Sequence, residues 1–553
     1  MDDWREVRTH QSKREEEHHD KEQAQLFSFC FFLGTEMAHF DQSENYWLPS
    51  SIKGARAETK KTYPTLNLSL FFTLAISMAS PNSVKILDIC EVAAAYDSTK
   101  SATETILSPT FFELSGLRFP PSECLCFFKL TDSNPTFFHS VIFPNLKKSL
   151  SHALLHFLPI VGSLTWPPES SRPIFVYHPN NDSVSVTLAE CNGDFDRLIG
   201  NGIHEAVESH PYAPQFVATE TRSPLVVLQV TLFPNKGFCI GMAMHHAIFD
   251  GKSASMFLRA WAYTCKYIVE KGEAPRLLPA EITPSFEWKS IQDSKGLEEA
   301  YINLWATMGK RLESGSDSNP KSVKPLTKLE VQPNLLRATF HLSSEAIKKL
   351  RESVLRYHPE ATDPTKRLHL STYLLACSYV LICLVKARGG DADREVYFAW
   401  SVDCRSRLDP PLPPNHFGDT IVAHHIVSKA GDFMQENGLA IIAEKLSASI
   451  NGLEKGLLEG SSERFEMLLG LGAEVRLISA AGATGLKFYN TDFGWGNVEK
   501  VELTSIDRTG AFSVLDIGNG SDRRIEIGVA LKRPEMESFA SFFSNGVEVM
   551  SRL

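Results

Sequence analysis

The sequence predicts an α/β protein with two domains of comparable size. Apolar runs typical of strands alternate with amphipathic helical stretches from residue 78 to about 270, and the same alternation returns from 296 to the C-terminus. Repeats at the periods of solenoid proteins are absent. Because 43% of the 553 residues are hydrophobic, the chain can bury a substantial core.

The spacing of apolar residues predicts the helices and strands of the first half. Residues 144–156 place their apolar side chains on one helical face, whereas residues 184–188 alternate apolar and polar side chains like a half-buried strand. The continuous apolar runs 225–230 and 237–244 predict strands buried on both faces. Segment 271–295 is rich in proline and polar residues and lacks periodicity, which is typical of a crossover between domains.

The second half is predicted to contain three helical regions, a strand at 395–402 and closing strands between 498 and 532. The helical regions are 296–312, 344–357 and 432–456. A further helix, 374–385, is apolar nearly all round, with Ser371 or Thr372 as its cap and Gly389-Gly390 at its end. It is too short to cross a bilayer, so we expect a buried helix.

The first 77 residues differ from the rest of the chain. They begin with a charged, polar stretch and contain two short apolar runs, neither as long as the roughly 20 residues of a membrane span. We interpret residues 1–77 as a disordered extension or a mistaken start, with the functional chain beginning at Met78. The expected division is then 78–270, a linker at 271–295, and 296–553.

Charge and cysteine content limit the class of protein and its compartment. The net charge of −10 and the pI near 6.0, without a basic stripe, argue against a nucleic-acid-binding protein. The ten cysteines are scattered and mostly set among apolar neighbours, so we expect reduced, buried thiols in a cytosolic protein.

Residues 241–252, GMAMHHAIFDGK, carry the first chemically informative pattern. The histidines follow a buried strand, and Ser253 can cap the helix that comes next. At this point three interpretations stay open: a metal site, a structural histidine, or a catalytic base. A metal needs at least three ligands, and adjacent histidines on an extended segment point to opposite sides, so the metal interpretation has little support.

A second pattern, Asp492-Phe493-Gly494-Trp495-Gly496, stands near the C-terminus. Together with His246-Ala247-Ile248-Phe249-Asp250-Gly251 it resembles the DFGWG and HxxxDG signatures of the plant BAHD acyltransferases, in the order that family shows. Segments 107–121, 156–168 and 401–414 also resemble the family, and the likeness runs from about Met78 to the C-terminus.

The resemblance implies two chloramphenicol-acetyltransferase-like domains, each a mixed sheet flanked by helices, with a channel at their interface. Segments 401–411, 505–510 and 525–531 look most like the branch that acylates sugars of anthocyanins, flavonoids and other phenolic glucosides. The expected substrates are therefore an acyl-CoA, most often malonyl-CoA in that branch, and a phenolic glycoside. We expect a cytoplasmic monomer that uses no metal or further cofactor and binds no membrane.

The resemblance also implies roles for single residues. His246 is the expected general base, and Asp250 turns away from it to pair with an arginine, for which Arg405 is the candidate. Gly251 and the five residues 492–496 are expected to support the site structurally, although the Trp495 indole is a candidate donor to the oxyanion. Lys252 is a candidate contact for an anionic donor group, and His245 is expected to be a packed neighbour.

One stretch departs from the family pattern. The branch usually shows YFGNC where this chain has His416-Phe417-Gly418-Asp419-Thr420. An added carboxylate disfavours an anionic malonyl group if it faces the channel. Two alternatives therefore accompany the main hypothesis: an acetyl- or hydroxycinnamoyl-CoA O- or N-acyltransferase, and a catalytically silent binding homologue.

Overall fold

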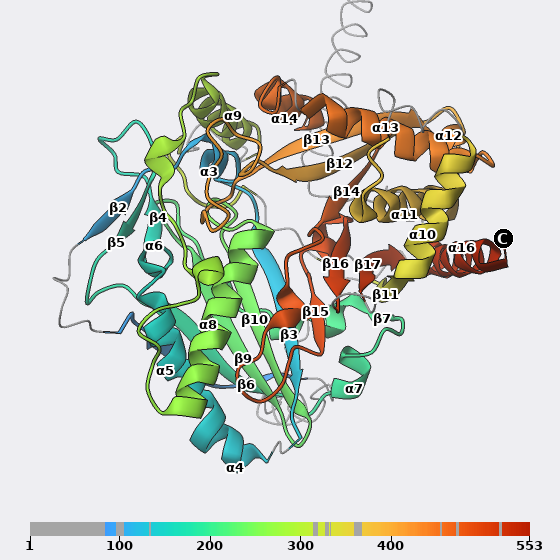
Figure 1. Ribbon diagram of the computed structural model, residues 1–553. Coiled ribbons are helices and arrows are strands. Elements are labelled where there is room, and N and C mark those ends of the chain that lie inside the picture. Colours follow the sequence, from blue (N-terminus) through green and yellow to red (C-terminus); the bar gives the residue numbers. More distant parts are fainter. Residues whose placement is uncertain are drawn as a thin grey trace, which may run out of the picture.

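The computed structural model describes residues 83–95, 104–131, 134–312, 319–326, 331, 333–358, 368–453, 456–469, 471, 475–518 and 523–552. The predictions for residues 1–77, including a start at Met78, lie outside these ranges. Figure 1 shows two halves, each built around a β-sheet with helices packed against it. Both of these sheets contain parallel and antiparallel neighbours, so the predicted α/β class with mixed sheets is confirmed.

The sheet of the N-terminal half has six strands. Their order is β1 (Lys85–Val92), β6 (Val184–Glu190), β9 (Val226–Phe233), β10 (Gly237–Met244), β3 (Ser122–Lys129) and β15 (Lys500–Glu502). Every residue of β9 and β10 is buried, as their apolar runs predict. Helices α5 (Phe143–Leu154) and α8 (Gly251–Lys271) pack against each other and cover one face of this sheet (Figure 1).

The sheet of the C-terminal half has seven strands. Their order is β13 (Ile421–Lys429), β12 (Glu395–Asp403), β14 (Arg476–Ala481), β16 (Phe512–Ile517), β17 (Arg524–Lys532), β11 (Leu335–Ser343) and β7 (His204–Glu205). The helices of this half include α9 (Leu297–Leu312), α10 (Ser344–Arg356), α12 (Ala430–Met434), α13 (Gly438–Gly452), α14 (Ser461–Leu469) and α16 (Arg533–Arg552).

Helix α11 (Thr372–Arg388) is the buried helix that the sequence predicts. The Ser371 side chain caps it by accepting a hydrogen bond from Leu374 N at 3.2 Å, and Gly389 ends it. It contacts α10, α12, α13 and α16. Because these helices surround it, α11 needs no polar face toward solvent. Among the described residues, no helix is both long and apolar enough to cross a membrane.

Two short strands cross the predicted boundary between the halves. Strand β15 comes from the C-terminal half but pairs with β3 in the N-terminal sheet. Conversely, β7 comes from the N-terminal half but pairs with β11 in the C-terminal sheet. The division at 271–295 remains a prediction. The exchange of strands means that neither sheet is complete without a segment of the other half.

The N-terminal half contains a second, smaller sheet of four strands. Its order is β2 (Thr105–Leu107), β5 (Ile174–Tyr177), β4 (Ser163–Thr165) and β8 (Arg222–Pro224). Periodicity did not predict it, because strands of three or four residues are too short to display a period of two.

A buried ionic cluster joins the two large sheets where the strands are exchanged. Arg337, on β11, places Nη1 2.6 Å from Asp507 Oδ1 and Nε 3.5 Å from Glu502 Oε1 on β15. All three side chains are almost fully buried, and the guanidinium is the permanently charged partner of both carboxylates. His210 also lies 3.0 Å from Asp507, and His204 lies 3.8 Å from Glu502.

Arg337→Met therefore leaves two buried carboxylates without their permanently charged partner. We expect it to lower the free energy of unfolding by about 3–5 kcal/mol in denaturant titrations. The control Arg523→Met removes an arginine that is 42% exposed and pairs with Asp516, so its cost should stay below about 1 kcal/mol. Equal effects of the two substitutions would contradict a structural role for the cluster.

Candidate active site

The predicted site begins where β10 ends. His245 N still donates to Leu225 O at 2.8 Å, and then Ile248 N and Phe249 N both donate to His245 O at 3.2 Å. The chain thus turns tightly between a buried strand and helix α8. His246 lies in this turn with its side chain 27% exposed, whereas its neighbours on both sides are buried.

The prediction that Ser253 caps α8 is wrong. The cap is Asp250, whose Oδ1 accepts a hydrogen bond from Ser253 N at 2.8 Å, and Gly251 is the first residue of the helix. A carboxylate at this position also suits the positive end of the helix dipole. The Ser253 hydroxyl instead contacts the loop after β12, donating to Gly418 O at 2.9 Å and accepting from Gly418 N at 3.1 Å.

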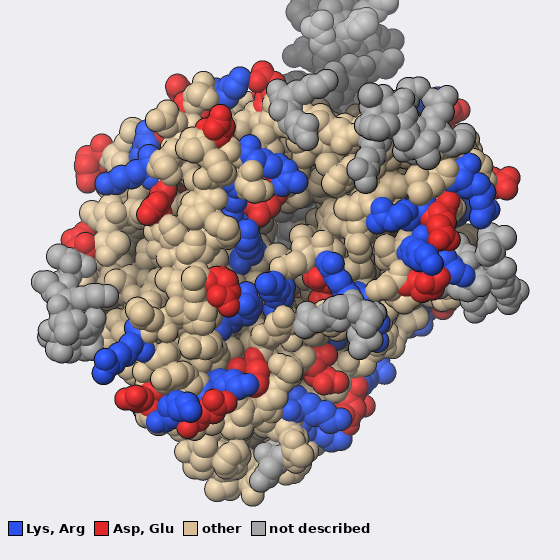
Figure 2. All heavy atoms as spheres, in the orientation of Figure 1, with Lys and Arg blue, Asp and Glu red and all other residues tan. Residues whose placement is uncertain are grey.

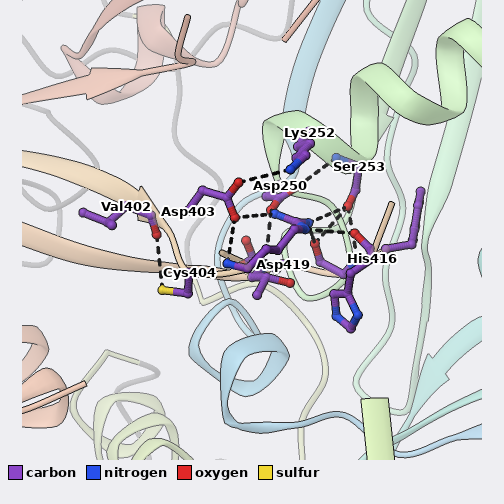
Figure 3. Close-up of polar contacts among 12 residues, drawn as sticks. Asp250, Lys252, Ser253, Val402, Asp403, Cys404, His416 and Asp419 are labelled. Carbon is purple, nitrogen blue, oxygen red and sulfur yellow. Dashed lines mark hydrogen bonds and ion pairs between the residues drawn. The ribbon is translucent and has the colours of Figure 1, made fainter. Parts of the chain in front are cut away.

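Arg405 lies opposite Asp250, as the sequence analysis expects. Its Nη1 is 2.7 Å from Asp250 Oδ2 and 2.9 Å from Asp403 Oδ1, and both Arg405 and Asp250 are 2% exposed (Figure 3). The remaining guanidinium donors reach His416 O at 2.9 Å and Gly418 O at 3.0 Å. One side chain therefore holds the start of α8 and the loop 404–420 together.

The predicted crossover segment also holds that loop. Trp288 Nε1 donates to Phe417 O at 2.6 Å, Asn415 Nδ2 donates to Thr283 O at 2.7 Å, and Phe417 N donates to Ser285 O at 2.8 Å. Segment 271–295 is therefore more than a spacer, because it fixes the backbone on which the altered residues 416–420 lie.

Asp419, in the stretch that departs from the family pattern, contacts His246 directly. Its Oδ2 lies 3.0 Å from His246 Nδ1, and its side chain is only 2% exposed. This contact leaves Nε2 as the ring nitrogen available for proton transfer. Phe119 packs its ring against the imidazole at a centroid distance of 5.5 Å.

The two partners change each other's pKa values. Burial lowers the pKa of His246, but the charge and hydrogen bond of Asp419 outweigh burial and hold the pKa above its ordinary value. Burial raises the pKa of Asp419 to about 6, against the opposing charge of His246. The charge of each partner therefore favours the charged form of the other.

His245 is a packed neighbour with no exposed surface for chemistry. It is 1% exposed, and its Nδ1 accepts a hydrogen bond from Ala247 N at 3.1 Å. Burial, followed by the charge of His246, lowers the pKa of His245 to about 3, so it stays neutral.

Glu113 is a second buried carboxyl close to the pair. It belongs to α3 (Phe111–Ser115), where it forms a capping box with Thr110, whose N and Oγ1 donate to Glu113 Oε2 at 2.9 and 2.5 Å. Burial raises the pKa of Glu113 to about 8. Gly116, which follows this helix, lies so close to the turn that a Cβ there would be 2.7 Å from His246 O.

Lys252 projects from the first turn of α8 at the edge of the site. Its Nζ lies 3.3 Å from Asp403 Oδ2, and its side chain is 38% exposed (Figure 3). Figure 2 shows that basic side chains gather along the middle of this face, where the surface is hollowed between the two halves.

The DFGWG loop lies at the other end of α8. Asp492 Oδ2 accepts from Lys266 Nζ at 2.7 Å, and Phe493 packs edge-on against Trp261. Gly494 and Gly496 adopt φ angles of +105° and +120°, which favour glycine, and both N–H groups donate to Asp492 Oδ1.

This position removes Trp495 from the reacting groups. A Cβ at Gly494 would lie 3.5 Å from Lys266 Cα and 3.5 Å from Val269 Cβ. Lys266 lies about 24 Å from Asp250 along α8 at the usual helical rise. A tryptophan side chain does not span that distance, so the Trp495 indole cannot reach an oxyanion beside His246. Its packing against the hydrophobic core agrees with a supporting place in the loop.

No group of three His, Cys, Asp or Glu side chains suited to holding a metal ion occurs among the described residues. The nine cysteines of the described ranges are free thiols, and all but Cys90 are buried.

Sequence reasoning missed the contact between Asp419 and His246, and also the nearness of Glu113. The departure at 416–420 is the available signal, but from the sequence its carboxylate bears only on the donor, and only if it faces the channel. His246 and Asp419 are separated by 173 positions in the sequence, and no pattern in the segment between them predicts their contact.

Comparisons with known proteins extend these observations. A model of the Transferase family matches residues 119–545. Phenolic glucoside malonyltransferase 1 of Arabidopsis thaliana is 38% identical over 472 residues, which covers 84% of this chain and 98% of that protein. Malonyl-CoA:anthocyanidin 5-O-glucoside-6''-O-malonyltransferase of the same plant is 37% identical over 477 residues, with 84% and 99% covered.

The crystal structure of vinorine synthase shares the fold. It superposes with a TM-score of 0.58 at 20% identity, covering 82% of this chain and 96% of that one. The two-domain acyltransferase fold expected from the sequence is thereby confirmed.

Asp250→Ala should destabilise the protein as well as impair its activity. Arg405 would lose its buried partner and α8 its cap, so we expect the free energy of unfolding to fall by about 3–5 kcal/mol. Denaturant titration checks this value. Lys252→Met, which breaks a half-exposed pair two residues away, is the control and should cost less than about 1 kcal/mol. An Asp250→Ala protein as stable as the parent would contradict the account.

Glu113→Gln should stabilise the protein increasingly as the pH rises. The pKa of Glu113 is raised in the folded chain, so its contribution to stability is complete below about pH 4.5 and is lost as the pH approaches 8. Relative to the parent, the variant should gain about 2–3 kcal/mol between pH 5.5 and 7.5, because glutamine does not ionise. Denaturant titrations at both pH values measure the difference in free energy of unfolding between the two proteins. A difference that does not change with pH would contradict a Glu113 carboxyl that is buried and neutral.

Proposed function

The chain belongs to the Transferase family, the BAHD acyltransferases, and from this premise we propose that it transfers a malonyl group from malonyl-CoA to a sugar hydroxyl of a phenolic glucoside. The observation that carries the proposal is the likeness to two plant malonyltransferases over nearly their whole length. The enzyme class, an acyltransferase, follows from the family. The donor and the acceptor are the proposed part.

The chemistry requires a base. An alcohol is a poor nucleophile at neutral pH until its proton is accepted, and histidine is the natural acceptor. In the proposed mechanism His246 Nε2 takes the proton of the sugar hydroxyl while the oxygen attacks the thioester carbonyl. The tetrahedral intermediate then collapses, the carbon–sulfur bond breaks, and the imidazolium returns the proton to the CoA thiolate.

The place of His246 supports this role. The partial exposure of its imidazole lets substrates reach it, and its position at the end of a buried strand keeps it fixed. Asp250 is committed to Arg405 and to the helix cap, so it supports the turn rather than the ring of His246.

The environment of Asp419 supports a malonyl donor in spite of the added carboxylate. Its side chain is buried and bonded to His246, so its charge is directed at the imidazole and does not lie on an open surface. Lys252 is half-exposed at the edge of the site and forms an ion pair with Asp403. It is the candidate contact for the malonyl carboxylate. We further propose that the protein acts as a monomer in the cytoplasm, with acyl-CoA as co-substrate and no other cofactor.

An assay with the full chain tests the proposal. Malonyl-, acetyl- and coumaroyl-CoA are each incubated with flavonoid glucosides and their aglycones, and products are followed by mass spectrometry. We expect a malonyl mass gain on glucosides and none on aglycones. His246→Ala should reduce the rate by at least about 100-fold, whereas the control His178→Ala, which changes a 43% exposed histidine, should leave it unchanged.

Other products would select other functions. A preference for coumaroyl- or acetyl-CoA would overturn the proposed donor, and acylation of aglycones would overturn the proposed acceptor. Folded protein that turns over no pair would instead favour a silent binding homologue.

A further inference from the structure

Among the described residues, the Asp419 carboxylate has one hydrogen-bond partner, His246. Its Oδ2 contacts His246 Nδ1 at 3.0 Å, while its Oδ1 has no hydrogen-bond partner within the part of the chain that the structure describes. Asp250, in contrast, is neutralised by Arg405 at 2.7 Å. A buried carboxylate is costly unless a cation or several donors compensate it, so the natural counter-charge for Asp419 is a protonated His246.

The other acids near the pair do not compete for that role. Glu113, from α3, remains protonated at neutral pH because burial raises its pKa to about 8. The charge of Asp250, at the start of α8, also acts on His246, but Arg405 balances that charge.

The neighbouring histidines stay neutral. Burial, with the charge of His246, lowers the pKa of His245 to about 3, and burial, with the charge of Arg405, lowers the pKa of His416 to about 4. Asp419 is therefore the carboxylate that sets the charge state of His246.

We propose that Asp419 is a positioning residue, which fixes the proton of neutral His246 on Nδ1 and stabilises the imidazolium that forms when Nε2 accepts the acceptor's proton. The role rests on the proposed function, because it assumes that His246 is the base. The orientation is the one the reaction needs: Nδ1 is held by the protein, and Nε2 remains for the substrates.

The family-like residue at this position separates charge from hydrogen bonding. An asparagine, which the branch usually shows here, can still accept from Nδ1–H but carries no charge. Asp419→Asn therefore removes only the ionic component, whereas Asp419→Ala removes the hydrogen bond as well.

A titration without substrate tests the pairing first. The pKa of the His246 imidazole is measured by NMR on the full chain, with His246→Ala identifying the signal. We expect a pKa above the ordinary value of about 6.5 in the parent and a decrease of about one unit or more in Asp419→Asn. A parent pKa below 6.5, or no difference between the proteins, would overturn the proposal.

The pH dependence of kcat/KM tests the role in turnover. The acidic limb follows the loss of neutral His246, so it should move to lower pH in Asp419→Asn, with a roughly tenfold lower kcat and an unchanged KM for acyl-CoA. Asp419→Ala should be slower still. Asp182→Asn, a matched change at a buried aspartate paired with Arg222, should retain the parent profile.

The two proposals can fail separately. Superposable profiles for the parent and Asp419→Asn would overturn the role of Asp419 while leaving the acyltransferase intact. Absence of turnover with every donor would overturn the proposed function, and the NMR titration would still decide whether Asp419 controls His246.

Discussion

The ion pair between Arg405 and Asp250 is the interaction on which the site depends. Asp250 caps α8 in the N-terminal half, and Arg405 belongs to the loop after β12 in the C-terminal half. Both side chains are buried. The same guanidinium binds the carbonyl oxygens of His416 and Gly418. A buried pair of this kind is costly to break, because each partner would be left charged in a poorly solvated place.

The chemistry of the site follows from that constraint. Holding Gly418 against α8 places the next residue, Asp419, beside His246, which comes from the opposite half. The proposed base and the carboxylate proposed to orient it are therefore brought together by the docking of the two halves. The exchange of β15 and β7 between the large sheets, with the Arg337 cluster beside it, strengthens the same docking at a second place.

Much of the architecture could be predicted from local pattern. The buried strands β9 and β10 and the all-apolar helix α11 show their periodicity directly, and the family signatures led to His246, Asp250 and Arg405. Contacts between distant segments could not be predicted in this way. The pairing of Asp419 with His246 and the crossing of β15 into the N-terminal sheet depend on tertiary packing, which leaves no periodic trace in the sequence.

A crystal structure of the chain with a bound non-hydrolysable malonyl-CoA analogue would show whether the substrates meet at His246 and Asp419. We expect the carbonyl that replaces the thioester to lie next to His246 Nε2, with Nδ1 bonded to Asp419 and with Arg405 still bridging Asp250 to the loop 404–420. An analogue bound away from His246, or an Asp419 carboxylate turned away from the imidazole in that complex, would contradict this arrangement.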